Sequence, residues 1–391
     1  MNVTITPGPL AGTITPPPSK SQAHRLLIAA ALGTGESRIE NLAHSQDIDA
    51  TLRCMAALKT PGDGLPELDC GESGSTLRFL IPVALALRGG GRFTGHGRLM
   101  ERPQEPYFAI FREKGISYEQ KDGTLTVEGR LTTGDYTLPG DVSSQFVTGL
   151  LYALPLLDGD SRILLTTPLE SRGYIDMTLD ALEQFGVQAE YDGERTFRVP
   201  GNQTYQARDL TIEADWSNAA FWYAAVSLGC DLEIQGLNAF STQGDMRIVP
   251  YYMKLQGKGP VELDVSQCPD LVPPLAAMAA LRGGETTSIV NAARLRIKES
   301  DRLATVTEVL NALGGQVEEF QDHLVIYGKE RLAGGVTVSG HNDHRIAMMA
   351  AIAAIRCENP VTITGAECVQ KSYPKFWEDY RSLGGTLTCD T

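Results

Sequence analysis

The sequence predicts an α/β protein built from six copies of one β-α-β-α-β-β unit, arranged as two similar domains of three units each. Three observations predict this fold: six Ala/Leu-rich segments with polar heads, a regular spacing between the heads, and a short β-prone run after each segment. With one anchor residue per segment, the successive spacings are 54, 69, 73, 53 and 73 residues, so the first two nearly recur as the last two. The anchors are Ser21, Ser75, Ser144, Ser217, Asp270 and Asp343.

The six segments are predicted to be buried helices with polar N-termini. Ser or Asp at each head can accept hydrogen bonds from the free N–H groups of a helix start. The Ala and Leu behind are good helix formers and place apolar side chains on nearly every face. The segments begin at Ser19, Glu72, Val142, Trp216, Pro269 and Asn342.

Each buried helix is followed by a short strand and a second helix with a polar face. The strand candidates include SRILLTT and TTSIVNA, and most second helices end on a glycine turn such as LNALGGQVEEF. The chain is expected to cross between domains near Pro16–Pro18 and near Ile212–Asp215. The predicted domains are therefore residues 17–213, and residues 1–16 together with 214–391.

Charge and cysteine content restrict the classes of partner. The net charge of −14, from 34 Lys and Arg against 48 Asp and Glu, repels nucleic acid and anionic lipid. Any anion site must therefore be a local cluster of cations. Seven cysteines without a C-x-x-C pair indicate a reducing compartment. The N-terminus lacks a signal peptide pattern and no stretch is apolar enough to span a membrane, so we expect a soluble cytoplasmic protein. We also expect a monomer.

Three helix heads carry groups that suit anions or hydroxyls. SKSQAHR, residues 19–25, places a lysine, two serines and an arginine at a helix start, where unpaired N–H groups and the helix dipole already favour negative charge. GESGSTLR, residues 71–78, can wrap an anion with backbone amides, although a simple capping turn fits it equally well. VSSQF, residues 142–146, offers more hydroxyls than one cap requires.

Further cations stand where outer helices are expected to begin. In LRIKESDRL, Lys298 and Arg302 are four residues apart and are predicted to share one helical face, with Glu299 beside them. Arg102 in MERP and Lys371 in QKSYP occupy the same place in their units. NDHR, residues 342–345, adds a histidine and an arginine to the last buried helix, and an arginine there needs an anionic partner.

No metal or organic cofactor is expected. The cysteines and histidines lack zinc spacing, no EF-hand loop occurs, and neither a Rossmann fingerprint nor a kinase motif set is present. The chemistry is therefore expected to depend on acids, bases and cations.

In order along the chain, SKSQAHR, GESGSTLR, MERP, SSQF, KESDR, NDHR and QKSYP resemble the 5-enolpyruvylshikimate-3-phosphate synthase family. The resemblance runs from about residue 16 to 376. It implies an inside-out α/β barrel of two domains with a cleft between them, whose helix N-termini face the cleft. The implied reaction transfers the enolpyruvyl group of phosphoenolpyruvate to the 5-hydroxyl of shikimate 3-phosphate and releases phosphate, in the shikimate pathway to chorismate and aromatic amino acids.

The resemblance also assigns site residues. The residues expected to hold shikimate 3-phosphate are Lys20, Ser21, Arg25, Ser143, Ser144, Gln145, Ser171, Asp270 and Lys298. The residues expected to hold phosphoenolpyruvate are Lys20, Gly74, Arg102, Gln145, Arg302, Arg345 and Lys371. Asp270 is expected to take the hydroxyl proton and Glu299 to donate one to the methylene carbon, with Lys20 and His344 as alternatives.

Two alternatives stay open on sequence grounds. The first is the related enzyme that transfers enolpyruvyl to UDP-N-acetylglucosamine, which usually carries a K-N pair at the first helix and a loop cysteine, whereas this chain has K-S and no cysteine in residues 89–103. The second is a non-catalytic anion-binding protein of the same fold, which would have no need of Asp270 and Glu299. Departures from the family pattern occur at Glu72, Ser75, Gln104 and Arg294.

Overall fold

The protein is described here by a computed structural model covering residues 1–390. The chain forms two compact units, Met1–Ser19 with Glu213–Thr391, and Lys20–Ile212, which we call the terminal unit and the central unit. Each unit has its own hydrophobic core. The sequence places the boundaries after residues 16 and 213, and these domain limits stay a prediction.

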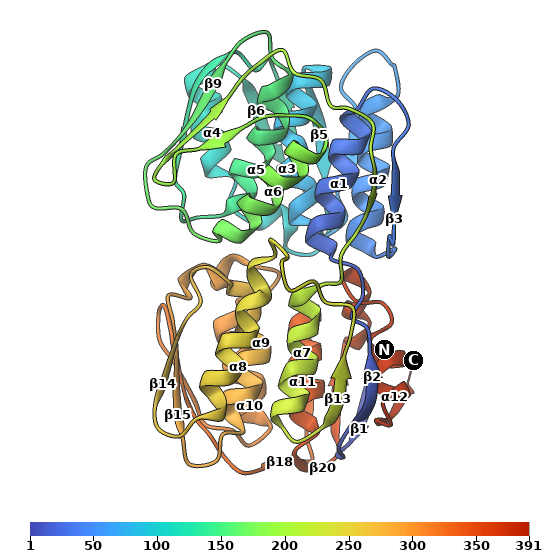
Figure 1. The fold of residues 1–391 in the computed structure, drawn as a ribbon, viewed down its shortest axis with the longest axis vertical. Helices are drawn as coiled ribbons and strands as arrows, with labels where there is room; N and C mark the ends of the chain where they lie inside the picture. The colour runs from blue at the N-terminus through green and yellow to red at the C-terminus, as the bar shows by residue number, and fades with distance from the viewer. Residues whose placement is uncertain (391) are drawn as a thin grey trace. The chain divides into compact units, whose positions relative to one another are not determined.

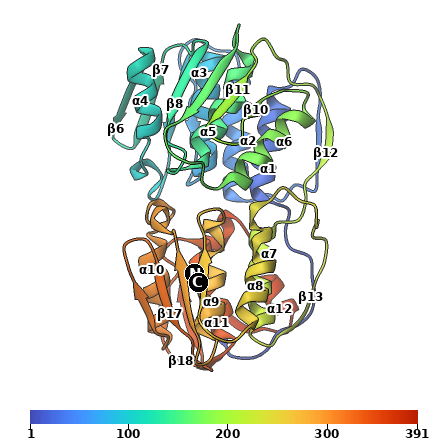
Figure 2. The ribbon, with the colours of Figure 1, turned by 60° about the vertical axis from the view of Figure 1, so that its left-hand side comes forward.

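In the central unit, helices lie side by side and the larger sheets lie outside them (Figures 1 and 2). The helices are α1 (Lys20–Leu32), α2 (Gln46–Lys59), α3 (Gly74–Arg88), α4 (Glu105–Lys114), α5 (Ser144–Ala153) and α6 (Arg172–Gln184). The strands are β3 (Arg38–Glu40), β4 (Glu67–Asp69), β5 (Gly90–Thr94), β6 (Ser117–Lys121), β7 (Thr124–Glu128), β8 (Gly134–Leu138), β9 (Ser161–Leu165), β10 (Glu190–Tyr191), β11 (Thr196–Val199) and β12 (Asp209–Thr211).

The terminal unit repeats this arrangement with both chain ends in it (Figure 1). Its helices are α7 (Trp216–Ser227), α8 (Ile248–Gln256), α9 (Val272–Ala280), α10 (Arg302–Ala312), α11 (His344–Ala354) and α12 (Phe376–Ser382). Its strands are β1 (Asn2–Thr6), β2 (Ala11–Ile14), β13 (Asp231–Ile234), β14 (Val261–Asp264), β15 (Thr286–Val290), β16 (Val317–Glu319), β17 (Leu324–Tyr327), β18 (Leu332–Gly334), β19 (Thr337–Ser339), β20 (Cys357–Asn359), β21 (Val361–Thr364) and β22 (Thr386–Asp390).

Six short 3-10 turns connect these elements. They are η1 (Leu99–Glu101), η2 (Leu154–Leu156), η3 (Gly244–Arg247), η4 (Pro269–Leu271), η5 (Ala293–Ile297) and η6 (Ala366–Lys371). Three of them, η1, η5 and η6, lie between a strand and the outer helix of the same repeat.

Four sheets share one strand pattern, and this pattern is the physical form of the repeat. In each, a buried helix connects two parallel strands, and two antiparallel strands continue the sheet beyond the second of these. Three have the orders β4-β5-β7-β6, β8-β9-β11-β10 and β14-β15-β17-β16. In the fourth, β19-β21-β1-β22, the N-terminal strand β1 takes the place of the missing hairpin strand, pairing antiparallel with β21 and β22.

The predicted α/β architecture is confirmed, with one difference in detail. The two repeats that contain α1 and α7 have only two-stranded parallel sheets, β3 with β12 and β2 with β13. The Gly- and Pro-rich connections after α2 and α8 lead directly to β4 and β14, so no residues remain there for a hairpin.

The buried helices form as predicted, because apolar side chains surround them. All nine residues of α9 and all eleven of α11 are buried. Among the described residues, no helix is both long enough and apolar enough to cross a bilayer.

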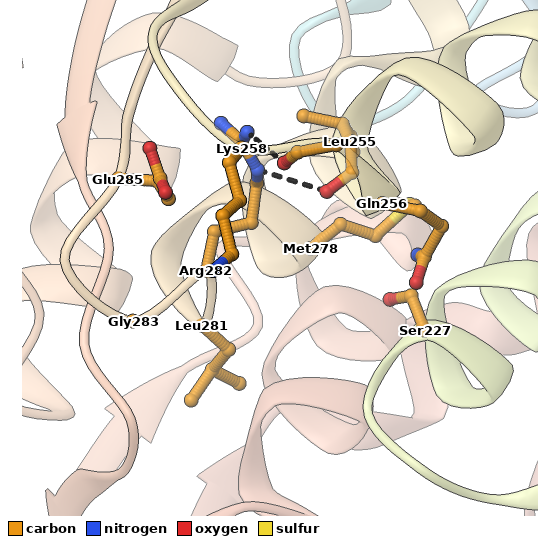
Figure 3. A pocket seen from close by; sticks show the side chains of 10 residues that line it. Ser227, Leu255, Gln256, Lys258, Met278, Leu281, Arg282, Gly283 and Glu285 are labelled. Carbon is orange, nitrogen blue, oxygen red and sulfur yellow. Dashed lines mark hydrogen bonds between the residues drawn. The ribbon is translucent and has the colours of Figure 1, made fainter.

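Arg282, at the C-terminal end of α9, ties several loops of the terminal unit together. Its guanidinium makes five hydrogen bonds, to the carbonyls of Leu255, Gly257, Gly259 and Thr286 and to Thr287 Oγ1, at 2.8–3.3 Å. It lines a surface pocket with Lys258 and Glu285 (Figure 3). Since all five N–H donors are used, this pocket offers a ligand no free guanidinium edge.

The central unit contains an equivalent arginine. Arg88, the last residue of α3, lies in the same LRGG sequence context and donates to the carbonyls of Leu58, Thr60 and Gly62. In both units, an arginine at the end of a buried helix therefore caps the carbonyl end of the preceding outer helix.

We expect Arg282→Met to lower the free energy of unfolding by about 3 kcal/mol, because five acceptors, two of them in buried bonds, lose their donor while an apolar stem remains. Chemical denaturation monitored by circular dichroism measures the change. Arg331→Met, at an exposed arginine of the same unit, is the matched control and should change stability little. Equal stability of the two variants would contradict the role assigned to Arg282.

Candidate active site

The outer cations are placed by 3-10 turns rather than by helices. Arg102 follows η1, Lys298 follows η5, and Lys371 is the last residue of η6. The prediction that Lys298 and Arg302 share a helical face is wrong, because residues 298–300 form a bend. Helix α10 begins only at Arg302, since the Asp301 side chain caps it by accepting from the N–H of Ala304 at 3.2 Å.

In the central unit, Lys20 opens α1 and pairs with a carboxylate that sequence reasoning missed. Its Nζ lies 2.8 Å from Asp47 Oδ2, and both side chains are largely buried, at 16% and 11% exposed. Asp47 stands in the first turn of α2, where Ser45 caps the helix. An Asp in a first helical turn is common, so nothing in the sequence marks it as the partner of Lys20.

Arg25 is a buried cation without a carboxylate partner among residues 1–390. Its Nε donates to Thr178 Oγ1 and its Nη1 to the Ser21 carbonyl, both at 2.8 Å. Phe79 and Tyr174 lie against the guanidinium, and burial lowers the pKa of Arg25. A buried charge with neutral partners is costly, and an anionic ligand would relieve that cost.

The start of α5 presents a fixed set of polar groups. Ser143 caps the helix, Ser144 is buried, and Gln145 is held at both ends of its amide. Gln145 Oε1 accepts from Arg78 Nη1 at 2.9 Å, and Nε2 donates to Ser75 Oγ at 3.1 Å.

Arg78 orients this group although it carries no predicted role. It also donates to the Pro103 carbonyl at 3.0 Å and stacks on Phe146. Ser75, one of the departures from the family pattern, therefore still supplies the hydroxyl that accepts from Gln145.

Ser171, at the N-cap of α6, adopts an uncommon backbone conformation. It is buried and has φ 54° and ψ 43°, in the left-handed region that non-glycine residues rarely adopt. Such backbone strain persists only where the surrounding structure holds it, and it is frequent at ligand sites.

Gly74 and Arg102, both predicted to contact one substrate, lie against each other. Gly74 is the first residue of α3, and an added Cβ there would lie 2.6 Å from Arg102 Nη1. Arg102 is buried, and its Nε finds no hydrogen-bond partner within residues 1–390. The glycine thus makes room for an unpaired guanidinium beside the N-terminus of a helix, where anions are favoured.

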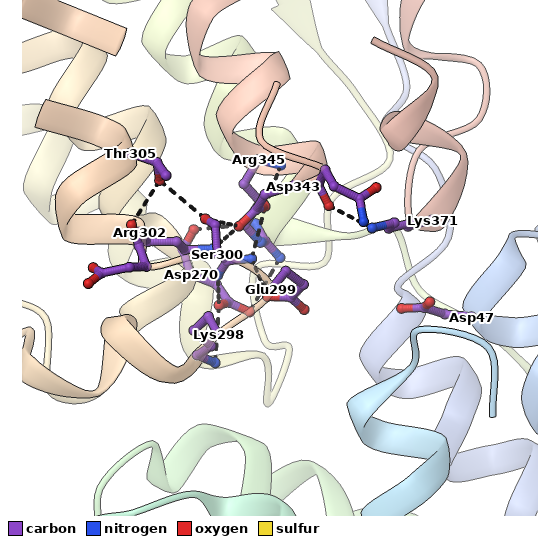
Figure 4. Close-up of polar contacts among 12 residues, drawn as sticks. Asp47, Asp270, Lys298, Glu299, Ser300, Arg302, Thr305, Asp343, Arg345 and Lys371 are labelled. Carbon is purple, nitrogen blue, oxygen red and sulfur yellow. Dashed lines mark hydrogen bonds and ion pairs between the residues drawn. The ribbon is translucent and has the colours of Figure 1, made fainter. Parts of the chain in front are cut away.

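In the terminal unit, three carboxylates surround the fully buried Arg302 (Figure 4). Its Nη1 bonds to Asp270 at 2.8 Å, its Nη2 to Glu299 at 2.7 Å, and its Nε to Asp343 at 2.8 Å. Burial opposes the charge, but the three carboxylates outweigh it and raise the pKa of Arg302.

Asp270 joins the other predicted cations of this unit to the same network. Lys298 Nζ lies 3.4 Å from Asp270 Oδ1 and Arg345 Nη2 lies 3.3 Å from Oδ2. Burial lowers the pKa of Lys298, against the attraction of Asp270. The anionic partner that Arg345 was predicted to need is therefore supplied by the protein itself.

Lys371 and His344 are placed around the start of α11. Lys371 is buried and donates from Nζ to the Asn342 carbonyl at 2.6 Å. His344 is the first residue of α11 and is also buried. Asp343, which caps this helix through the Arg345 N–H, is the second carboxylate that sequence reasoning treated only as a cap.

The two units differ in how their cations are neutralised. In the central unit, Arg25 and Arg102 have no carboxylate partner among the described residues. In the terminal unit, Lys298, Arg302 and Arg345 face Asp270, Glu299 and Asp343. The first arrangement is ready to accept anions, and the second combines cations with candidate acids and bases. No metal-binding group of three or more side chains occurs within residues 1–390.

His24 lies on α1, the helix that also carries Lys20 and Arg25. It is buried, and it makes the free energy of unfolding depend on pH. Its Nδ1 lies 2.8 Å from Thr51 Oγ1. Burial, together with the charges of Lys20 and Arg25, lowers the pKa of His24 well below 6.5. The folded protein therefore keeps this ring neutral while the unfolded chain protonates it below about pH 6.5.

We expect stability to fall as pH drops below about 6.5, by up to about 1.4 kcal/mol per pH unit from His24, because the unfolded state binds the extra proton. Denaturation of wild type and His24→Gln at several pH values between about 5 and 8 measures this slope. The variant should show a shallower slope, whereas His96→Gln, at an exposed histidine, should not. The same slope in His24→Gln and wild type would rule out the effect.

Comparisons with known proteins identify the family of the chain. A family model described as EPSP synthase (3-phosphoshikimate 1-carboxyvinyltransferase) matches residues 5–258 and 251–380. The chain is 48% identical to the 3-phosphoshikimate 1-carboxyvinyltransferase of Clostridium kluyveri, covering 98% of both chains. It is 44% identical to the protein of the same name from Clostridium beijerinckii, covering 99% of this chain and 98% of the relative.

Solved structures share the fold. The EPSP synthase from Acinetobacter baumannii has a TM-score of 0.80 at 24% identity, over 99% of this chain and 100% of that one. The enolpyruvyl transferase NikO from Streptomyces tendae has a TM-score of 0.75 at 19% identity, over 99% and 98% of the two chains. By its sequence match over nearly its whole length, the chain belongs to the EPSP synthase family, the 3-phosphoshikimate 1-carboxyvinyltransferases.

Proposed function

We propose that the protein transfers the enolpyruvyl group of phosphoenolpyruvate to the 5-hydroxyl of shikimate 3-phosphate and releases inorganic phosphate. The observation that carries this proposal is the Arg302 network, which brings a candidate base, Asp270, and a candidate acid, Glu299, to one guanidinium. Family membership supports it. This reaction belongs to the shikimate pathway of aromatic amino acid biosynthesis. The cytoplasmic location and the monomeric state stay predictions from sequence.

In the proposed first step, the 5-hydroxyl attacks the central carbon of phosphoenolpyruvate. Asp270 takes the hydroxyl proton, and Glu299 gives a proton to the methylene carbon, which becomes a methyl group. The product is a tetrahedral intermediate that still carries the phosphate. Acid and base groups of this kind each contribute about 10² to 10⁴-fold to a rate.

In the proposed second step, the carbon–oxygen bond to phosphate breaks and its electron pair leaves with the phosphate. The carboxylate of Glu299 takes a proton back from the methyl group, which restores the carbon–carbon double bond, and the proton held by Asp270 passes to the departing phosphate. Nearby cations stabilise the negative charge of the departing phosphate. Arg302, Arg345 and Lys371 are assigned to this task in the terminal unit, and Lys20 and Arg102 in the central unit. Lys20 and His344 remain alternatives to Asp270 and Glu299 as proton carriers.

The shikimate 3-phosphate contacts are assigned to groups that suit a phosphate and ring hydroxyls. Arg25, with Ser21 on the preceding helical turn, is suited to the phosphate because its charge meets no carboxylate among residues 1–390. Ser143, Ser144, Gln145 and Ser171 supply hydroxyl and amide groups at two helix starts. Gln145, fixed at both ends of its amide, keeps one N–H for a ligand.

The direct test of this function is phosphate release on mixing the protein with phosphoenolpyruvate and shikimate 3-phosphate. Release is expected only when both substrates are present. Release with UDP-N-acetylglucosamine instead would identify the related transferase, and no release with either acceptor would identify a non-catalytic binder. Neither the family model nor the relatives favour these alternatives.

We expect Gly74→Ala to raise the KM for phosphoenolpyruvate about tenfold and to change that for shikimate 3-phosphate little, because the new methyl group displaces Arg102. Steady-state kinetics with each substrate varied in turn measures both constants. Gly62→Ala is the matched control, since a Cβ there meets no atom within 4 Å. An unchanged KM for phosphoenolpyruvate in Gly74→Ala would remove Arg102 from that site.

We expect Asp270→Asn to lower kcat by about 10² to 10⁴-fold, because the amide cannot accept the hydroxyl proton. Binding of phosphoenolpyruvate, measured by calorimetry, should be retained because Lys298, Arg302 and Arg345 lose a competing anion. A loss of affinity with unchanged kcat would instead make Asp270 a binding residue only.

A further inference from the structure

Arg302 is already occupied by protein carboxylates in the ligand-free structure. Four hydrogen bonds run from its guanidinium to Asp270, Glu299 and Asp343, and its side chain is only 1% exposed. A guanidinium this deeply buried needs counter-ions whether or not substrate is bound. Four of its five N–H donors are used, so a substrate anion that takes two bonds to Arg302 must displace a carboxylate.

The three carboxylates differ in how firmly they are held. Asp343 is fully buried and also accepts from Ser300 Oγ at 2.9 Å and from the Arg345 N–H at 3.0 Å. Asp270 is bonded to Lys298 and Arg345 as well as to Arg302. Both are therefore fixed by several elements of the fold.

Glu299 is the carboxylate that can leave. Its side chain is 21% exposed, and its backbone lies in the bend of residues 298–300, outside any helix or strand. Rotation of this side chain breaks the Arg302 contact without unfolding a regular element.

On the basis of the proposed function, we infer that Glu299 occupies the place on Arg302 that an anionic group of phosphoenolpyruvate takes on binding, and that its displacement provides the proton donor for the methylene carbon. The shape of the guanidinium fits this exchange, because it bonds carboxylate and phosphate oxygens in the same planar way.

The exchange balances in charge and in protons. One Nη2–H···O bond to Glu299 breaks and one to the substrate anion forms, so Arg302 never loses its counter-ion. The released carboxylate has lost a cation and gained an anionic neighbour, both of which favour protonation, and it takes a proton from solvent. It then transfers that proton to the methylene carbon.

The charged groups around Glu299 set how strongly it binds this proton. Arg302 on α10 and Lys298 on the same bend attract the carboxylate, and Asp270 on η4 opposes it. The next shell, in contact with those residues, consists of Arg294 on η5 and of Asp343 and Arg345 on α11. Four cations and three carboxylates are named here, so the site has a net positive charge to which substrate binding adds negative charge.

The test is calorimetric titration of phosphoenolpyruvate into wild type, Glu299→Gln and Glu299→Ala in two buffers of different ionisation enthalpy. A shikimate 3-phosphate analogue without the 5-hydroxyl is present, so that no turnover occurs. We expect both variants to bind phosphoenolpyruvate about tenfold more tightly than wild type, because no carboxylate competes for Arg302. Wild type should take up more protons on binding than either variant, because only wild type releases a carboxylate that can be protonated.

The matched control is Glu319→Gln, which removes another carboxylate paired with an arginine of the same unit, at 2.8 Å from Arg296. It should bind and take up protons as wild type does. Equal or weaker binding in the Glu299 variants, or proton uptake equal to that of wild type, would overturn the inference. Failure of wild type to bind phosphoenolpyruvate at all would refute both the inference and the proposed function, whereas phosphate release by wild type keeps the function even if the inference fails.

Discussion

The pairing of Arg302 with Asp343 is the interaction on which the terminal unit's site depends. Both side chains are almost fully buried, and each would be costly to bury alone. Asp343 also caps α11, so one carboxylate fixes the start of that helix, the position of Arg345 and the orientation of Arg302. Asp270 and Glu299 then attach to a guanidinium that cannot move. A protein with a net charge of −14 can hold several cations here because their counter-ions are built in.

The repeat provides the scaffold for this arrangement. Each unit places buried helices side by side, and outer cations follow 3-10 turns at matching points of the repeat. Arg88 and Arg282 close the opposite ends of the same helices in the two units by capping carbonyls. Cationic side chains near the C-termini of the buried helices cap backbone carbonyls, and those near the N-termini are proposed to contact the ligands.

Much of the fold could be predicted from the sequence, because the signals involved are local. The buried helices were visible as Ala- and Leu-rich runs behind polar heads, and the duplication was visible in their spacing. The absence of hairpins after α2 and α8 is explained by Gly- and Pro-rich connections that can be recognised once the strands are known. The place of β1 between β21 and β22 could not be derived from pattern, since it joins the two ends of the chain.

The site was predicted less completely, because its partners are distant in sequence. Lys20 and Arg302 could be recognised as cations near helix starts, but Asp47 and Asp343 had ordinary capping contexts and gave no sign of their ion pairs. Lys298 was assigned to a helix that begins four residues later, since the cap at Asp301 competes with the periodic pattern. Arg78 was missed because an arginine within an apolar helix has no distinctive spacing, although its burial against Phe146 and Gln145 makes its role clear.

The central claim is that the carboxylates around Arg302 are arranged for exchange with a substrate anion. A crystal structure with phosphoenolpyruvate and the unreactive shikimate 3-phosphate analogue bound tests it most directly. The account predicts that Arg302 Nη2 bonds to the substrate anion, that Asp343 keeps its contacts, and that Glu299 has turned away from the guanidinium. A bound substrate that leaves the Arg302–Glu299 pair intact would contradict it.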